Sequence, residues 1–360
     1  MSSSHRHQEI DGLRGIAALS VMLGHWGEFL RKQNAPAEWY DWLGKVFLEY
    51  FSFGRLGIVA FFCVSGFVVP FSFRGPQPLV TFPITRFFRL YPAYWTSIFV
   101  AAAVFPLCGQ EPFTAIRILV NMTMLQIVLG QSHIIGPYWT LFVELIFYGV
   151  CYAMFAARLL HRPFANFVVM CILLGIALAG GFYRYVHPEN NFAVGVPTYL
   201  AAMHFGTIAR LHTLEHQGMP RWLYPASLAI LLGAVMTANT AAYYYAQNEL
   251  VGWVAADVGY LIGVGLFLLA IHRHWFSGPR LAWLGLISYS MYLFHMIVKQ
   301  VCQAIWPAAV PWELAAGTLT LLYFMVTILV ATVVHSLVET PMIRIGRSTE
   351  RFAERTLRLA

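Results

Sequence analysis

Two residues of the first apolar stretch have side chains that can do chemistry. Arg14 and His25 lie in "LRGIAALSVMLGHWGEFL", eleven residues apart. In an α-helix this spacing places the two side chains within about 20° of each other around the axis and about 16 Å apart along it. A cation and an imidazole are costly in hydrocarbon, so we expect their shared face to meet other polar groups or a ligand.

A carboxylate, Glu144, lies in another apolar stretch, "PYWTLFVELIFYG". A lone carboxylate inside a bilayer costs at least a few kcal/mol unless it is neutral or paired. Counted from the cytoplasmic ends of their helices, His25 and Glu144 reach similar depths, so we expect them to pair. The carboxylate would then orient the imidazole and raise its basicity, leaving the other ring nitrogen to take a proton from a hydroxyl.

A second histidine, His295, lies in "ISYSMYLFHMIVK". We expect it about 18 Å from the inner end of its helix, close to the depth of the first pair. The sequence leaves two interpretations open: His295 joins this polar layer, or it is a hydrogen-bonded core residue.

Two arginines, Arg86 and Arg89, follow each other at a spacing of i, i+3 in "TRFFRLYPAYW". This spacing makes them neighbours on one helix face at the cytoplasmic boundary. One interpretation is a positive anchor within an aromatic belt. The other is a fork for a phosphorylated ligand, because guanidinium groups bind phosphate bidentately. Arg14, on the same side of the membrane, could complete such a fork.

Ser65 and Gly66 interrupt the apolar stretch "FFCVSGFVVPF". No base is fixed beside Ser65 in the sequence, and no G-x-S-x-G motif surrounds it, so we do not expect a serine nucleophile. A pair of small residues in an apolar helix favours close packing against another helix.

The composition excludes a soluble globular protein. Of 360 residues, 59% are apolar and 11% are charged, whereas soluble domains carry about 25% charged residues. The net charge of +7 belongs to the loops, so we interpret it as a sign of membrane topology and not of nucleic-acid binding. Five cysteines stand singly without C-x-x-C spacing, so neither a disulfide framework nor a metal site is expected.

Apolar segments of about 20 residues predict an all-α, polytopic membrane protein with about ten spans. A shorter segment at 113–129 carries Arg117 and Asn121, which favours an interfacial or re-entrant position. The predicted spans are 11–31, 52–71, 87–107, 137–157, 164–182, 192–210, 222–241, 251–271, 283–305 and 313–338.

The distribution of basic residues predicts the orientation. With the N-terminus in the cytoplasm, sixteen of the 23 Lys and Arg residues fall on the inside and seven on the outside. This bias favours cytoplasmic positions for both termini. Asp11 and Arg14 interrupt the entry to the first span, so we expect a retained helix and not a cleaved signal peptide. We expect a transmembrane domain over residues 1–345 and a basic cytoplasmic tail over 346–360.

Taken together, the motifs resemble those of the acyltransferase type 3 family of integral membrane proteins. Thr140 stands where the family usually has Ser, and Thr340 stands where Arg is common. The resemblance covers nearly the whole chain, and its motifs are "IDGLRGIAALSVMLGH", "FFCVSGF", "RFFRLYPAYW", "PYWTLFVELIFY", "ISYSMYLFH" and "VETPMIR".

The resemblance implies transfer of an acyl group, usually acetyl, from cytoplasmic acyl-CoA to a hydroxyl of a glycan or other sugar-containing acceptor. By motif match His25 would be the catalytic base and Glu144 its partner. Arg14, Arg86 and Arg89 would contact CoA. Four further residues are expected to contact substrate or to support the residues that do, namely Tyr138, Trp139, His295 and Ser65.

The resemblance also implies a multi-pass protein of the inner (plasma) membrane whose partners are the bilayer and a carbohydrate or glycan-lipid acceptor. Some relatives carry a further soluble domain; we expect none here, and we therefore expect the membrane unit to complete the acylation. Direct transfer and an acyl-enzyme intermediate both stay open, as does the oligomeric state.

Two other classes of function stay open. In a proton-coupled transporter or flippase, His25, Glu144 and His295 would form a proton relay and no bond would be made. In a non-catalytic glycan-binding or assembly partner, the buried carboxylate would have no purpose. The arginine pair and the lack of an evident inverted repeat weigh against transport.

Overall fold

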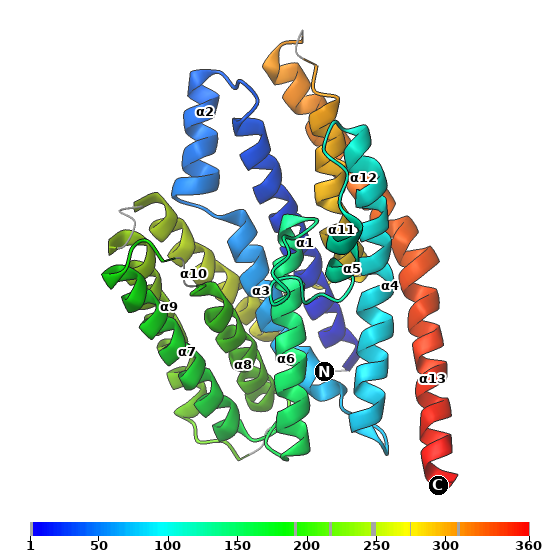
Figure 1. Ribbon diagram of the computed structural model, residues 1–360. Helices are drawn as coiled ribbons and strands as arrows, with labels where there is room; N and C mark the ends of the chain where they lie inside the picture. The colour runs from blue at the N-terminus through cyan, green and yellow to red at the C-terminus, as the bar shows by residue number, and fades with distance from the viewer. Residues whose placement is uncertain are drawn as a thin grey trace. The chain divides into compact units, whose positions relative to one another are not determined.

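The computed structural model describes residues 3–190, 193–215, 218–245, 250–273, 275–307 and 310–359. Within these residues every regular element is a helix and no strand is present (Figure 1). The predicted all-α fold is therefore confirmed. Ala360, the last residue of the predicted tail, lies outside the described residues.

The chain forms two compact units, each built from two separate stretches of sequence. Unit 1 comprises Met1–Phe71 and Phe147–Gly285, and unit 2 comprises Ser72–Ile146 and Leu286–Ala360. Helices α6 (Trp139–Ala156) and α11 (Pro279–Ala304) each contribute residues to both units.

Unit 1 contains the helix that carries Arg14 and His25, which is α1 (Ser3–Arg31). Apart from α1 and its parts of α6 and α11, its elements are α2 (Ala37–Gly44), the π-helical turn η1 (Lys45–Glu49), α3 (Phe53–Val68), most of η2 (Val69–Ser72), α7 (Pro163–Val186), α8 (Gly195–Thr213), α9 (Leu223–Asn239), the π-helical turn η4 (Thr240–Tyr245) and α10 (Leu250–His272).

Unit 2 contains the arginine pair, Arg86 and Arg89, and the carboxylate Glu144, which the sequence places inside the membrane. Its remaining elements are α4 (Pro78–Leu107), α5 (Ala115–Asn121), η3 (Gly136–Tyr138), α12 (Trp312–Val334), the π-helical turn η5 (His335–Glu339) and α13 (Thr340–Leu359).

The centre of unit 1 is a close crossing of α3 and α8. A Cβ atom on Gly66 would overlap the carbonyl oxygen of Met203, and one on Gly206 would overlap that of Cys63. The hydroxyl of Thr207 also donates a hydrogen bond to the Gly66 carbonyl at 3.0 Å. Small residues let two backbones approach, so van der Waals contact and polar contact act together at this crossing.

Among the described residues, eight helices or helical runs are long and apolar enough to cross a membrane. Of the ten predicted spans, those in α1 and α8 fall outside this set. In α1 polar residues lower the hydropathy. Most of α8 is buried, and a helix surrounded by protein needs no apolar surface for lipid. The eight runs are Phe53–Ser72, Pro78–Leu107, Gly136–Ala156, Pro163–Val186, Leu223–Tyr243, Gly252–His272, Pro279–Ala304 and Trp312–Thr356.

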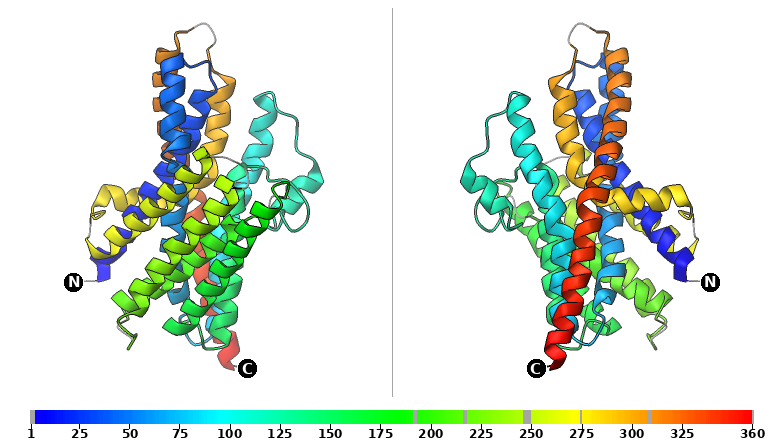
Figure 2. Two further views of the ribbon diagram at one scale, coloured as in Figure 1. Left: turned by 90° about the vertical axis from the view of Figure 1, so that its left-hand side faces the viewer. Right: turned by 90° about the vertical axis from the view of Figure 1, so that its right-hand side faces the viewer.

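The last of these runs continues well beyond the predicted tenth span. Helix α12 passes through the turn η5 into α13, which ends at Leu359. Within unit 2, α13 packs lengthwise against α4 (red and cyan in Figure 2). A Cβ on Gly346 would lie 2.7 Å from the Cβ of Phe88. The predicted tail is thus a helix held against its own unit.

The segment between α4 and α6 does not form a span. It contains the short helix α5 and a series of turns as far as Ile135, and the interfacial or re-entrant position expected for 113–129 stays a prediction. The side chain of Asn121 is buried and holds these turns together, because it donates to the carbonyl of Ser132 at 3.0 Å and accepts from the N–H of Ile134 at 3.1 Å.

Candidate active site

His25 lies in the last third of α1, and its side chain is 27% exposed. Its Nδ1 atom is 3.5 Å from Oε2 of Glu28, one helical turn further on. The preceding residue, Gly24, packs against the first turn of α3, since a Cβ there would lie 2.7 Å from the backbone nitrogen of Gly54. His25 therefore sits level with the beginning of α3, six residues before the end of α1 at Arg31, which is also the end of the predicted span.

Arg14 belongs to the same continuous helix, so the predicted shared face with His25 follows from helical geometry. Its guanidinium Nη1 is 3.6 Å from Oδ1 of Asp11, and the Arg14 side chain is 16% exposed. The positive charge predicted to contact CoA is therefore partly balanced by a carboxylate of its own helix.

Glu144 lies on α6 and is 5% exposed. It follows Thr140 by one helical turn, which places both side chains on one face of the helix. Glu144 belongs to unit 2 and His25 to unit 1. Each is described within its own unit, and their predicted pairing stays a prediction.

Polar residues at the start of α6 form a hydrogen-bonded cluster with α4 and α11. The buried Tyr138 hydroxyl lies 2.6 Å from Oγ of Ser97. The hydroxyls of Thr140 and Tyr292 are 2.7 Å apart, and each reaches the Pro137 carbonyl, at 3.0 Å and 2.9 Å. Trp139, which lies between Tyr138 and Thr140 in the sequence, is half-buried. The family-atypical Thr140 thus keeps the hydroxyl that a serine would supply.

His295 is fully buried one turn beyond Tyr292 on α11. Its Nδ1 lies 2.7 Å from the carbonyl oxygen of Tyr292. Because a carbonyl only accepts, Nδ1 carries the proton of this bond. This geometry suits a supporting histidine of fixed orientation.

The two arginines of the predicted phosphate fork are half-buried on α4. The Arg86 guanidinium lies over the ring of Phe82, 5.6 Å from its centroid. Between Arg86 and Arg89 lies Phe88, the residue against which Gly346 of α13 packs. Around α4, Phe88 lies about 160° from Arg86 and about 100° from Arg89, so α13 packs on a different side of the helix from the one that carries the fork.

Helix α13 carries further cations, of which Arg344 belongs to the motif "VETPMIR" and the others belong to the predicted tail. Its exposed face carries arginines spaced by three or four residues, and this spacing was the signal that could have shown them as one face. Gly346, which packs on Phe88 of α4, is buried and lies on the opposite face of α13 from these exposed arginines. The exposed arginines are Arg344, Arg347, Arg351 and Arg355.

Ser65 is buried and has the packing role that its small neighbour Gly66 suggested. Its carbonyl oxygen accepts the backbone N–H of Val69, and the adjacent glycine lies against α8. The predicted contact of Ser65 with substrate is not tested by this arrangement.

The sequence analysis missed a buried network that joins two of its own motifs. The Ser290 hydroxyl, in "ISYSMYLFH", donates to Oε1 of Glu339, in "VETPMIR". The other oxygen of Glu339 lies 3.2 Å from Nδ1 of His335. Ser290 and Glu339 are buried, so the carboxylate is satisfied by neighbours. The π-helical turn η5 brings His335 and Glu339 onto one side.

Comparison with known proteins assigns the chain to a family. The model of the acyltransferase type 3 family, described as "Acyltransferase domain", matches residues 7–336. Nodulation protein 10 of Rhizobium leguminosarum bv. viciae is 26% identical over 331 residues, covering 84% of this chain and 86% of that protein. No solved structure matches the chain.

Two further relatives are named as acyltransferases. Acyltransferase MdmB of Streptomyces mycarofaciens is 26% identical over 151 residues, covering 40% of this chain and 38% of that protein. A putative O-acetyltransferase of Staphylococcus aureus (strain COL) is 22% identical over 333 residues, covering 80% of this chain and 50% of that protein. Because the family model spans nearly the whole helical chain, the protein belongs to the acyltransferase type 3 family.

Proposed function

We propose that this protein transfers an acyl group, in the first instance acetyl, from cytoplasmic acyl-CoA to a hydroxyl of a sugar-containing acceptor. The observation that carries the proposal is the family match over residues 7–336, with relatives that include a putative O-acetyltransferase. The site of action would be the inner (plasma) membrane, which separates cytoplasmic CoA from an exported acceptor.

The donor side of the proposal rests on arginines. CoA carries a pyrophosphate and a ribose phosphate, and guanidinium groups bind phosphate through two parallel hydrogen bonds. Arg86 and Arg89 on α4 and the exposed arginines of α13 supply such groups within unit 2. Arg14 is a further candidate contact, although its ion pair with Asp11 would have to weaken when phosphate binds.

The chemical step needs a base. In direct transfer, His25 takes the proton of the acceptor hydroxyl while that oxygen attacks the thioester carbonyl. The carbon–sulfur bond then breaks, and the proton passes to the departing CoA thiolate. Glu144 would orient the imidazole and stabilise its protonated form. In a two-step route, a group on the enzyme would first carry the acyl chain, and the same base would serve the second step.

Acyl transfer and proton-coupled transport differ in what is consumed. We would reconstitute the full chain in proteoliposomes with acetyl-CoA labelled in its acetyl group and a panel of oligosaccharides. The proposal predicts release of one free CoA thiol for each label that becomes bound to saccharide. Movement of saccharide across the bilayer without thiol release would instead establish a transporter.

A further inference from the structure

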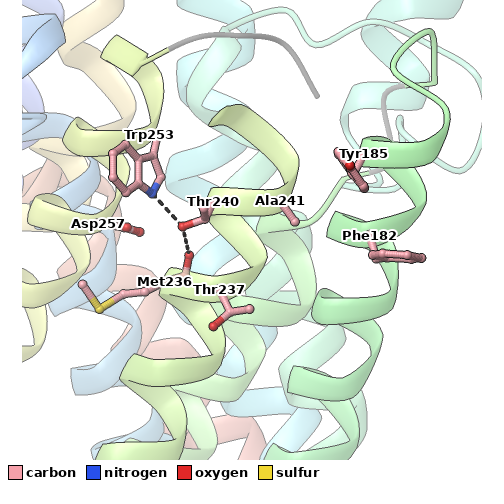
Figure 3. A pocket seen from close by; sticks show the side chains of 8 residues that line it. All are labelled: Phe182, Tyr185, Met236, Thr237, Thr240, Ala241, Trp253 and Asp257. Atoms are coloured by element: carbon pink, nitrogen blue, oxygen red, sulfur yellow. Dashed lines mark hydrogen bonds between the residues drawn. The ribbon is translucent and has the colours of Figure 1, made fainter. Parts of the chain in front are cut away.

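Unit 1 contains a cavity of about 720 Å³ where α7 and α9 end and α10 begins. Figure 3 shows Phe182 and Tyr185 of α7 on one side of it and Trp253 and Asp257 of α10 on the other. Residues of α9 and η4, among them Thr240, lie between these two sides. The volume falls within the range of pockets that hold small organic ligands.

The α10 side of the cavity is polar and held in place. The indole N–H of Trp253 donates to Oγ1 of Thr240 at 2.8 Å, and the Thr240 hydroxyl donates to the Met236 carbonyl at 2.7 Å. The Asn239 side chain donates to Oδ1 of Asp257 at 2.9 Å. Since a carboxylate has about four lone-pair sites, Asp257 keeps capacity to accept hydrogen bonds from a ligand.

The α7 side is aromatic. Phe182 and Tyr185 are spaced by i, i+3, so their rings lie on one helix face, and they are 62% and 48% exposed. Nearby, the exposed hydroxyl of Thr237 donates to its own helix at 2.8 Å and can still accept a hydrogen bond. Aromatic rings, hydroxyls and a carboxylate thus line one cavity.

This combination fits a sugar ring better than a lipid chain. The faces of a pyranose are apolar C–H surfaces that stack on aromatic rings, while its edge carries hydroxyls that donate to carboxylate and hydroxyl oxygens. An acyl chain would leave Asp257 and the threonine hydroxyls against hydrocarbon without new partners, which is costly.

The cavity lies at the same end of unit 1 as His25. Arg55, in the first turn of α3, reaches the Gly252 carbonyl of α10 at 3.5 Å and interacts electrostatically with Asp257. Its neighbour Gly54 is the residue against which Gly24, next to His25, is packed. A short chain of contacts through α3 therefore links the cavity to the helix turn that carries the proposed base.

We infer that this cavity binds a sugar ring of the acceptor, stacked on Phe182 and Tyr185 and hydrogen-bonded to Asp257 and Thr237. The identification of this sugar as the acceptor rests on the proposed function. Binding itself requires no acyl transfer, so the two can be tested separately.

Binding would be measured with the full chain in nanodiscs, without acetyl-CoA, against tritiated tetrasaccharides of glucose, galactose, mannose, rhamnose and N-acetylglucosamine. We expect at least one to bind the wild type saturably and Tyr185→Ala at least tenfold more weakly. The control is Phe164→Ala, because Phe164 is 56% exposed on the same helix but lies at its other end. Removing either exposed ring should leave the fold intact.

Thr237→Val provides a second variant of nearly equal size, and we expect it to weaken binding at least threefold. Equal binding by wild type, Tyr185→Ala and Thr237→Val would overturn the inference, as would the absence of binding by every tetrasaccharide. Displacement of the bound saccharide by phosphatidylglycerol in proportion to its share of the nanodisc would also overturn it and indicate a lipid site.

The acyl-transfer assay separates this inference from the proposed function. If a tetrasaccharide binds in a Tyr185-dependent way but no label is transferred, the cavity inference stands and the proposed function fails. If label is transferred with the same acceptor KM in wild type and Tyr185→Ala, the proposed function stands and the cavity inference fails.

Discussion

His25 has a carboxylate neighbour that motif reasoning overlooked. Glu28 lies 3.5 Å from its Nδ1 and is 44% exposed, whereas the proposed partner Glu144 is 5% exposed. A contact with a carboxylate that is largely exposed is screened by water and contributes little, so the buried carboxylate is the better candidate to tune the imidazole.

The two carboxylates predict different kinetics. Glu144→Gln should lower kcat by about 10²- to 10⁴-fold, the usual contribution of general acid–base catalysis. The matched variant Glu28→Gln should lower it by less than about threefold, because solvent already screens that pair. Steady-state acetyl transfer measures both. A loss for Glu28→Gln as large as that for Glu144→Gln would transfer the partner role to Glu28.

The hydrogen bond between Ser290 and Glu339 makes a prediction about stability. Ser290→Ala removes a buried donor and leaves a carboxylate oxygen without it, which costs about 1–3 kcal/mol. We expect a lower Tm in detergent. The control Ser336→Ala lies in η5, the turn that also carries Glu339. It removes an exposed hydroxyl bonded to its own helix and should change stability by less than about 0.5 kcal/mol. Equal melting of the two variants would contradict a structural role for the network.

At the scale of helices, sequence patterns predicted packing better than they predicted length. The Ser65–Gly66 pair indicated a close helix contact, and Gly66 does lie against Met203 of α8. For residues 346–360 the sequence predicts a basic cytoplasmic tail, and the position of this stretch relative to the membrane stays a prediction. That stretch lies in the helix α13 as far as Leu359, and its Gly346 packs against Phe88 of α4, a contact between residues far apart in the chain.

The α3–α8 crossing can be tested with glycine variants. Gly66→Ala would force its Cβ into the carbonyl of Met203, so we expect loss of folded protein or a strongly lowered Tm. Gly175→Ala provides the control, because nothing lies within 4 Å of a Cβ built there and alanine favours the helix. Size-exclusion profiles and melting curves compare them. A well-folded Gly66→Ala with unchanged Tm would contradict the close crossing.

Helix α13 makes a separate prediction for the donor. Replacing Arg347 and Arg351 together by alanine should raise the KM for acetyl-CoA by roughly three- to thirtyfold with little change in kcat, because lost phosphate contacts weaken ground-state and transition-state binding equally. Arg221→Ala removes an exposed arginine two residues before α9 begins at Leu223 and should leave that KM unchanged. An unaltered KM in the double variant would remove α13 from the donor site.

For the whole molecule, composition and periodicity were sufficient to predict a helical membrane protein, and ordered motifs were sufficient to predict its family. The side of the membrane on which the termini lie stays a prediction. The division into two units was not predictable, because each unit joins stretches separated by more than 70 residues. The buried network of Ser290 and Glu339 and the aromatic cavity likewise depend on packing between distant helices.

The central claim is that His25 is the base in acyl transfer from CoA to a hydroxyl. The most direct measurement compares wild type with His25→Gln in the same proteoliposomes, following label from acetyl-CoA to saccharide under single-turnover conditions. The account predicts that His25→Gln binds acetyl-CoA as the wild type does but transfers label at least about 10²-fold more slowly. Transfer at the wild-type rate by correctly folded His25→Gln would contradict it.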